Sequence, residues 1–175
     1  MKTKAIKNLG LAAVFLLAIA IAPALAQSNT QTTKAVTFQV SLAEWYDLSL
    51  NPTTISFTDV APTPGANPPS VDISANSTVD VASFAVIIPT SGLKLTVKAN
   101  GDFDTTIPAS TVSWTASAGY EAGTLSTSDV TVGSWAAGPI VHYHTGTLTF
   151  KFHRDYVNQK PGTYQITATY TLSKV

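Results

Sequence analysis

The sequence predicts an all-β protein built as an antiparallel β-sandwich. Apolar residues alternate with polar ones in short blocks, Val, Ile and Thr recur within these blocks, and clusters of Gly, Pro, Asn and Asp separate them. A period of two places the apolar side chains of a strand on one face, which can then pack against a second sheet. After the first 26 residues the sequence has no heptad pattern, no internal repeat and no amphipathic helix.

The N-terminus is organised like a secretory signal peptide. Three lysines within the first seven residues precede an apolar run over residues 11–22, and Pro23 follows this run. The run has 12 residues, fewer than the roughly 20 that a membrane-spanning helix needs. A small-x-small pattern follows, as at signal cleavage sites. We expect cleavage between Ala26 and Gln27, and therefore a secreted protein.

An alternative is a type IV pilin-like leader that is cut near Gly10-Leu11. The apolar helix would then remain in the mature protein as the core of a filament. Pro23 disfavours this alternative, because it would break that helix. N-terminal sequencing of the mature protein separates the two.

The composition predicts one mature domain of 149 residues that depends on packing and strand pairing for its stability. The chain has no cysteine, and 11% of its residues are charged. The leader contains three of the ten basic residues and none of the ten acidic ones, so the mature formal net charge is −3. Because an acidic chain does not attract a phosphate backbone, we expect no nucleic-acid partner. A surface with few charges offers little resistance to self-association.

Several strands can be predicted from the pattern. Over residues 93–99 one face consists of Leu93, Leu95, Val97 and Ala99, and over residues 164–172 it consists of Tyr164, Ile166, Ala168, Tyr170 and Leu172. Between Val79 and Ile88 apolar residues fall on both parities, which predicts a central strand covered on both faces. Four prolines between Asp59 and Ser70 predict a stiff exposed loop.

Residues 141–153 predict a β-hairpin with a two-residue turn at Thr145-Gly146. In that register one face consists of Val141, Tyr143, Leu148, Phe150 and Phe152, and all three histidines lie on the other face. A shift of one residue would destroy this separation of apolar and polar side chains.

The three histidines are the first candidates for a metal site. In the hairpin register His142 and His144 are neighbours, whereas His153 lies about 13 Å further along the sheet at the usual rise per residue. A three-histidine zinc site is therefore not formed. We expect solvated histidines on an exposed strand face.

A calcium loop is the second metal candidate. Asn100, Asp102 and Asp104 carry oxygen ligands at alternate positions, as the start of such a loop does. The sixth position is Thr105 instead of Gly, and the twelfth is Thr111 instead of Glu. A polar turn agrees better with these residues.

The sequence carries no catalytic motif. Glu44 and Glu121 could be considered as a glycosidase pair, but their spacing in the sequence does not define a cleft. A nucleophile-elbow serine, a phosphate-binding glycine loop and a zinc helix motif are all missing. We therefore expect no catalytic residues, no metal, no cofactor and no enzymatic activity.

Aromatic residues leave a secreted carbohydrate-binding module as an alternative. The residues that could stack on sugar rings are Trp45, Trp114, Tyr120 and Trp135. In a sandwich of this size tryptophan is more often buried or half-buried, and aromatic residues on separate strands need not form one platform.

Asn76-Ser77-Thr78 matches the acceptor sequon for N-glycosylation. The other match, Asn51-Pro52-Thr53, is blocked because its middle residue is proline. In a secreted protein the first match predicts an exposed Asn76 that can be glycosylated.

The mature N-terminus combines a polar tether with an amphipathic strand. Residues 27–33 are polar, and the apolar residues Val36, Phe38, Val40 and Leu42 then alternate with polar ones. Donor-strand exchange requires such a segment, because the donor must leave its own domain and complete the sheet of a neighbour. A terminal strand that pairs within its own domain fits the same residues.

The whole mature chain resembles an archaeal bundling pilus subunit, a family similar in fold to the bacterial biofilm filament protein TasA. The resemblance rests on the leader, the polar N-terminal stretch with its alternating strand, and three blocks. These blocks are Ala75–Phe84, Gly92–Leu95 and Pro161–Tyr164.

The resemblance implies a jelly-roll-like sandwich over residues 43–175, preceded by a signal peptide over residues 1–26 and a tether and donor strand over residues 27–42. It implies an extracellular homopolymer on the cell surface that acts in cell adhesion or biofilm formation. Its partners would be copies of itself, neighbouring filaments in lateral contact and cell-surface glycans. The C-terminal strand ending at Val175 is the first candidate for a wall of the acceptor groove.

Overall fold

The computed structural model describes residues 34–61, 70–117 and 119–175. The chain divides into two units, residues 1–40 and 41–175, and every strand belongs to the second unit. The strands are β1 (Trp45–Asn51), β2 (Ser70–Ser74), β3 (Val79–Val86), β4 (Leu93–Ala99), β5 (Val112–Ala116), β6 (Gly123–Thr124), β7 (Val130–Trp135), β8 (Val141–Asp155) and β9 (Ala168–Lys174). One short 3-10 helix, η1 (Ala109–Thr111), precedes β5.

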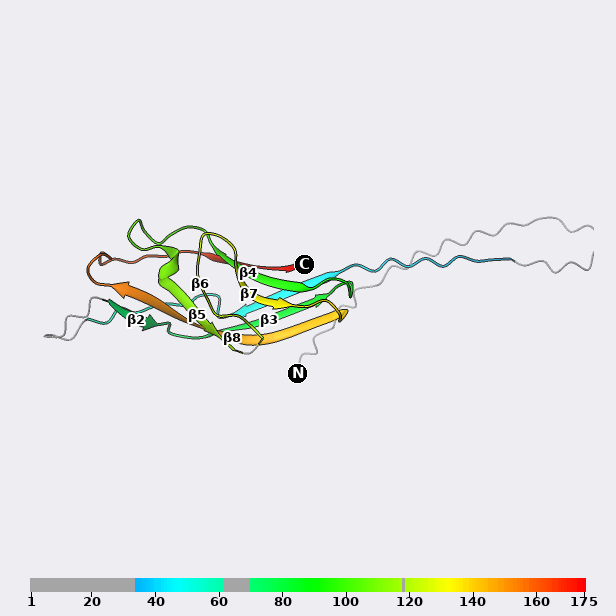
Figure 1. Ribbon diagram of the computed structural model, residues 1–175, viewed down its shortest axis with the longest axis horizontal. Coiled ribbons are helices and arrows are strands. Elements are labelled where there is room, and N and C mark those ends of the chain that lie inside the picture. Colours follow the sequence, from blue (N-terminus) through cyan, green and yellow to red (C-terminus); the bar gives the residue numbers. More distant parts are fainter. Residues whose placement is uncertain (1–33, 62–69, 118) are drawn as a thin grey trace, which may run out of the picture. The chain divides into compact units, whose positions relative to one another are not determined.

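The strands form two antiparallel sheets, which confirms the predicted all-β sandwich. The larger sheet has the order β1-β3-β8-β5-β6, with β2 also paired to β8, and the smaller sheet has the order β7-β4-β9. Figure 1 shows β4 and β7 of the smaller sheet lying over β3 and β8 of the larger one. On β8, residues 141–148 pair with β3 and residues 151–155 pair with β2.

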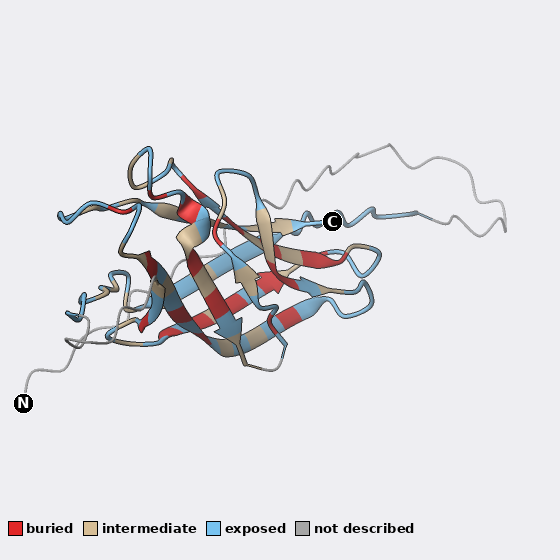
Figure 2. Cartoon of the chain, turned by 60° about the vertical axis from the view of Figure 1, so that its left-hand side comes forward, coloured by how far each residue is buried: buried red, intermediate tan, exposed pale blue. Residues whose placement is uncertain are grey.

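The core lies between the sheets. Buried and exposed residues alternate along the strands, as a period of two requires (Figure 2). The prediction for residues 93–99 is confirmed, because Leu93, Leu95, Val97 and Ala99 of β4 are all buried. The facing sheet contributes Val79 and Val81 of β3, Trp114 of β5, and Leu148 and Phe150 of β8.

The predicted hairpin at Thr145-Gly146 is wrong, because β8 is one continuous strand of 15 residues. Gly146 is a strand residue here, and its missing side chain makes room for a neighbour. A Cβ atom on Gly146 would lie 2.5 Å from the Tyr120 ring and 2.6 Å from Ser117 Oγ. The close approach of another backbone or ring explains the glycine without a turn.

Straightening the hairpin into one strand exchanges the faces of its first half. Even-numbered residues of β8 point into the core, so His142 is buried while Val141 and Tyr143 are exposed. The hairpin prediction had placed Val141 and Tyr143 on the apolar face and His142 on the polar face. A period of exactly two makes face assignment sensitive to any change of register or turn.

For residues 79–88 the predicted central strand is confirmed, but the prediction that both of its faces are covered is wrong. β3 lies between β1 and β8, so it is a central strand. Its even-numbered residues are not covered, however, and Phe84 is exposed. The outer face of this sheet therefore carries apolar side chains that no described residue covers as a second layer.

The predicted strand over residues 164–172 forms only in its second half, since β9 begins at Ala168. The signal peptide, residues 27–33 of the tether and the four prolines of the loop lie outside the described residues.

Candidate functional site

A groove with a volume of about 900 Å³ opens between the two sheets. It lies beyond the end of β1 and before the start of β9, where two segments without strand pairing form its walls. We call residues 53–59 the first wall and residues 163–167 the second wall. The inner strand residues that line the groove are Leu50, Ile73, Val79, Val112, Phe150, Phe152, Ala168 and Tyr170.

The first wall continues from β1. Pro52 follows the last residue of β1 and has no N–H to continue the β1–β3 ladder. Ile55 and Phe57 are half-buried, and the residues between them are exposed. Ser56 is tied to the β2–β3 connection, because its N–H donates to Asn76 Oδ1 at 2.8 Å and its carbonyl accepts from Asn76 N at 2.9 Å.

The second wall leads into β9. Tyr164 and Ile166 are half-buried and alternate with exposed residues, continuing the pattern of β9. Residues 163–166 form no backbone hydrogen bond with any residue that the structure describes. Thr167 is the exception in this wall, since its N–H donates to Asn100 Oδ1 and its carbonyl accepts from Asn100 N.

The floor of the groove is aromatic. The Phe57 and Phe152 ring centroids are 5.8 Å apart, and those of Phe103 and Phe152 are 6.0 Å apart in an edge-to-face arrangement. Such ring pairs contribute beyond the area that they bury. The floor is therefore preorganised to accept further apolar side chains.

One end of the groove is marked by Arg154, which is buried. Its Nε donates to Asp59 Oδ2 at 3.3 Å and its Nη1 donates to the Gln159 carbonyl at 2.6 Å. The Tyr156 ring lies 5.3 Å from the guanidinium carbon. These contacts fix the loop after β8 against the end of the first wall.

The other end of the groove is closed by the contact between β1 and β9. Beyond the groove lining, the same two segments are joined again where Lys174 Nζ lies 2.9 Å from Glu44 Oε2. The Lys174 ammonium lowers the pKa of Glu44, and the Glu44 carboxylate raises the pKa of Lys174. The groove is therefore open along its side but blocked at this end.

Tyr170 lines the groove close to this closed end. Burial raises its pKa to about 12, because a phenolate would lose its hydration there. The site thus favours neutral and apolar groups at this position.

The N-terminal segment carries exposed apolar side chains. Val36, Phe38, Val40 and Leu42 are between 69% and 86% exposed, and residues 34–44 form no strand. Four large apolar residues on alternate positions are thus left without a partner among the described residues. An exposed run of this kind marks an interaction site more often than a surface of scattered residues does.

The expectation of solvated histidines is wrong for two of the three. His142 is 1% exposed, and the His144 ring stacks on Trp135 with centroids 4.2 Å apart. Burial and the neighbouring His142 lower the pKa of His144. His153 lies on the opposite face of β8, where it is exposed and bonds to Asp72 Oδ1 at 2.8 Å.

The oxygen atoms of the calcium candidate already accept hydrogen bonds, two of them within the loop and one from the second wall. Asp102 Oδ1 accepts from Ala109 N at 2.8 Å, Asp104 Oδ1 accepts from Thr105, and Asn100 Oδ1 accepts from the second wall. The structure agrees with a polar turn at this position. No cluster of three or more potential metal ligands occurs in the part of the chain that the structure describes.

The aromatic and acidic candidates are not brought together at one site. Trp114 and Tyr120 are buried in the core, Trp135 is half-buried, and Trp45 is exposed on β1. Glu44 is occupied by Lys174, while Glu121 follows Tyr120 on the β5–β6 connection. Asn76 is exposed as predicted, with its Oδ1 bound to the first wall.

Sequence reasoning did not identify the first wall. Its signal was present, since Ile55 and Phe57 alternate with polar residues directly after Pro52. Nothing in the pattern itself, however, distinguishes a paired strand from an extended segment without a partner.

Searches against protein-family models, curated proteins and solved structures found no match to this chain. In the described ranges, no helix has the length and apolar character needed to cross a membrane.

Proposed function

We propose that this protein is the structural subunit of an extracellular filament, and that it polymerises by donor-strand complementation. The observation that carries the proposal is the open apolar groove, whose two walls are extended but unpaired. The same chain supplies an exposed amphipathic segment, Val36–Leu42, of the kind that completes such a groove. In this assembly each copy inserts that segment, the donor, into the groove of the next copy.

The lengths of donor and groove agree. The seven residues of the donor span about 23 Å as a strand. The segment from Thr163 to Tyr170, of which all residues but Thr169 line the groove, spans about 26 Å at the same rise. One strand would therefore occupy the groove along its length.

The chemistry of the two partners also agrees. The donor offers Val36, Phe38, Val40 and Leu42 on one face, and the groove offers an aromatic and aliphatic floor. Burying four such side chains contributes about 6–12 kcal/mol before the entropic cost of association. Main-chain hydrogen bonds to the second wall would add to this, because that backbone has unused donors and acceptors.

The closed end of the groove favours one direction for the donor. The donor is attached through Leu42 to its own folded domain, which cannot pass the contact between β1 and β9 of the acceptor. Leu42 must therefore lie at the open end, near Asp59 and Arg154, with Val36 toward Tyr170. This direction is antiparallel to β9, so the donor adds an edge strand to the smaller sheet.

This function assigns the protein to the outside of the cell, in keeping with the predicted signal peptide. Filaments of this kind act in cell adhesion and biofilm formation through mechanical continuity and not through catalysis. Strand insertion also explains how a cysteine-free domain with an open groove avoids nonspecific aggregation, since the neighbour covers its free edge.

A substitution in the donor tests the proposal. We expect mature wild-type protein to form filaments that are visible by electron microscopy, and Phe38→Asp to remain monomeric, because it would bury a carboxylate in the aromatic floor. Gln39→Asp is the matched control, since residue 39 lies on the opposite face of the donor, and it should polymerise. Normal filaments from Phe38→Asp would show that the donor is assigned wrongly.

Cysteine cross-linking tests the direction of the donor. The native chain has no cysteine, so an engineered pair reports only on its own distance. Ser41→Cys with Thr163→Cys should form an intersubunit disulfide, which requires Cα atoms within about 7 Å. Ser41→Cys with Thr169→Cys should not, since these residues would lie at opposite ends of the groove. The reverse result would mean a parallel donor.

A further inference from the structure

The outer face of the larger sheet carries an apolar patch that the core does not use. Trp45 of β1, Val86 of β3 and Val141 of β8 are direct cross-strand partners and form one row. Phe84 and Tyr143 are paired in the next row of the same face, where Asp47 of β1 is the third member. We call the five apolar residues the aromatic patch.

Four of the five residues of the aromatic patch are exposed and Val86 is half-buried, and none of the described residues forms a second layer over them. Trp45 is 63% and Tyr143 is 66% exposed, and Phe84 and Val141 are exposed as well. Beyond it on the same face, the next rows contain Ala82 with Thr145 and Asp80 with Thr147, which are small or polar. Apolar side chains gathered at one end of a sheet face mark an interaction surface.

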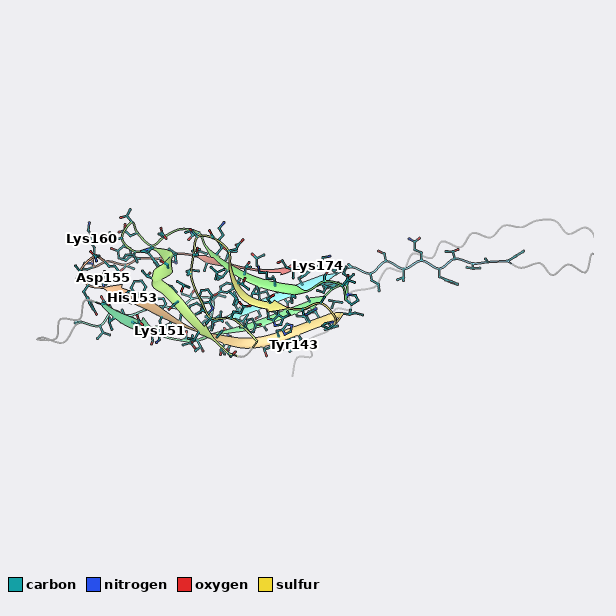
Figure 3. The ribbon with its side chains drawn as sticks, in the orientation of Figure 1. Tyr143, Lys151, His153, Asp155, Lys160 and Lys174 are labelled. Carbon is teal, nitrogen blue, oxygen red and sulfur yellow. The ribbon has the colours of Figure 1, made fainter. Side chains whose placement is uncertain are left out.

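The aromatic patch lies at the end of the sandwich where the donor joins β1. Figure 3 shows Tyr143 and Lys174 at this end, and Asp155 and Lys160 at the opposite end. Only three residue steps separate Leu42 from Trp45, which limits their Cα distance to about 11 Å. Once Leu42 is held in an acceptor, Trp45 must therefore lie close to the open end of that acceptor's groove.

The open end of the groove presents matching chemistry. Val60 and Val157 are exposed there, and Tyr156 holds them together by donating its hydroxyl to the Val60 carbonyl at 2.7 Å. Val157 lies three residues after Arg154, whose contact with Asp59 marks this end. Two exposed apolar surfaces thus lie at opposite ends of one molecule, as a head-to-tail polymer requires.

We infer that the aromatic patch is the second half of the subunit junction and is covered by the copy that accepts the donor. This inference rests on the proposed function, because the donor fixes which end of the neighbour comes near. The donor supplies the strand connection, and the aromatic patch packs against the Val60 and Val157 surface. The junction is then held at two places, which restricts rotation of one subunit about the other.

Covalent labelling of the full mature chain tests this inference. Hydroxyl radicals would be applied to wild-type filaments and to the Phe38→Asp monomer, and side-chain oxidation read by mass spectrometry. We expect oxidation of Trp45 and Tyr143 to fall at least fivefold in filaments. Trp114 is buried in the folded subunit, so it should stay unreactive in both samples and shows that the fold is kept.

A pair of substitutions on β8 gives an independent readout. Tyr143→Lys places a charge in the aromatic patch, whereas Thr149→Lys places the same charge on the same face about 20 Å further along. Tyr143→Lys should raise the subunit concentration in equilibrium with filaments at least tenfold, and Thr149→Lys less than threefold. Circular dichroism melts of both monomers confirm that the fold is kept.

The outcomes separate this inference from the proposed function. Filaments in which Trp45 and Tyr143 stay as reactive as in the monomer would overturn the inference and leave donor exchange intact. Protection of these residues only after an oligosaccharide is added would also overturn it, because the aromatic patch would then be a sugar platform. Absence of filaments from wild-type protein would overturn both.

Discussion

Two stretches of this chain have the same alternating pattern but different surroundings. β4 pairs on one side with β7 and on the other with β9, and every residue of its apolar face is buried. The stretch from Thr163 to Lys174 alternates just as regularly, yet it pairs only from Ala168 onward and only with β4. Its first half forms a wall of the open groove.

The difference shows that alternation specifies an extended, two-faced segment but not its partner. The apolar face of β4 receives its partners from the same chain. The second wall has a floor beneath Tyr164 and Ile166 but no strand beside it among the described residues. A free edge of this kind is a template for pairing with another chain, and the proposed donor is the segment that uses it.

Truncation of one residue in each stretch should give opposite results for folding and for assembly. In the Phe38→Asp monomer, Leu95→Ala should lower the free energy of unfolding by about 2–5 kcal/mol, because Leu95 is fully buried in β4. Ile166→Ala should lower it by about 1 kcal/mol or less, because Ile166 is half-buried. Urea denaturation measures both values.

In the polymerising chain we expect Ile166→Ala to weaken assembly more than Leu95→Ala does. Ile166→Ala should raise the subunit concentration that remains after sedimentation of filaments, since the donor would lose a contact. Equal effects of the two substitutions on folding would mean that the second wall is already packed within the monomer.

Alkaline pH should sharpen the comparison at Tyr170, where the paired and unpaired halves meet. Its pKa is about 12 in the folded chain and about 10 in an unfolded one. Between these values the unfolded chain has lost the proton and the folded chain has kept it, so stability falls as pH rises. The loss should reach about 2 kcal/mol by pH 12 and be absent below pH 9.

Urea denaturation of the monomer at a series of pH values measures this loss, and Tyr170→Phe serves as the control. The Phe variant should lose less stability over the same range, because it has no phenol to ionise. An identical pH profile for both proteins would show that Tyr170 is not desolvated.

The last prediction concerns the continuity of β8. Gly146→Ala should lower the free energy of unfolding by about 1–3 kcal/mol, because the new methyl group meets the Tyr120 ring and Ser117 Oγ. Gly101→Ala is the matched control, since a Cβ there has no neighbour within 4 Å. If the two variants are equally stable, Tyr120 is free to move, and the reason given for glycine in β8 is wrong.

The sequence predicted the antiparallel sandwich and the strand at residues 93–99, because periodicity is a local property. The prediction for residues 141–153 failed because a turn and a straight strand both satisfy the local pattern there. The choice depends on Tyr120, which precedes Gly146 by 26 residues and occupies the space above it. The histidine assignment failed for the same reason, since it was derived from that turn.

The candidate site was predictable in part. The donor residues Val36, Phe38, Val40 and Leu42 and the involvement of the C-terminal stretch are expectations from sequence, and both remain parts of the proposal. The first wall and the aromatic floor were not predicted, because they combine segments as distant as Ile55, Phe103 and Phe152.

What the sequence by itself determined was conformation: which segments are extended and which of their side chains share a face. The two-residue repeat of the extended backbone fixes this without reference to the rest of the chain. Only the tertiary structure decided partnership. Among the described residues it left Thr163–Thr167 without a neighbouring strand, and it placed Trp45, Val86 and Val141 in one row on the outer face of the larger sheet. Strand pairing joins residues that are far apart in sequence, so no local pattern records which edge stays free.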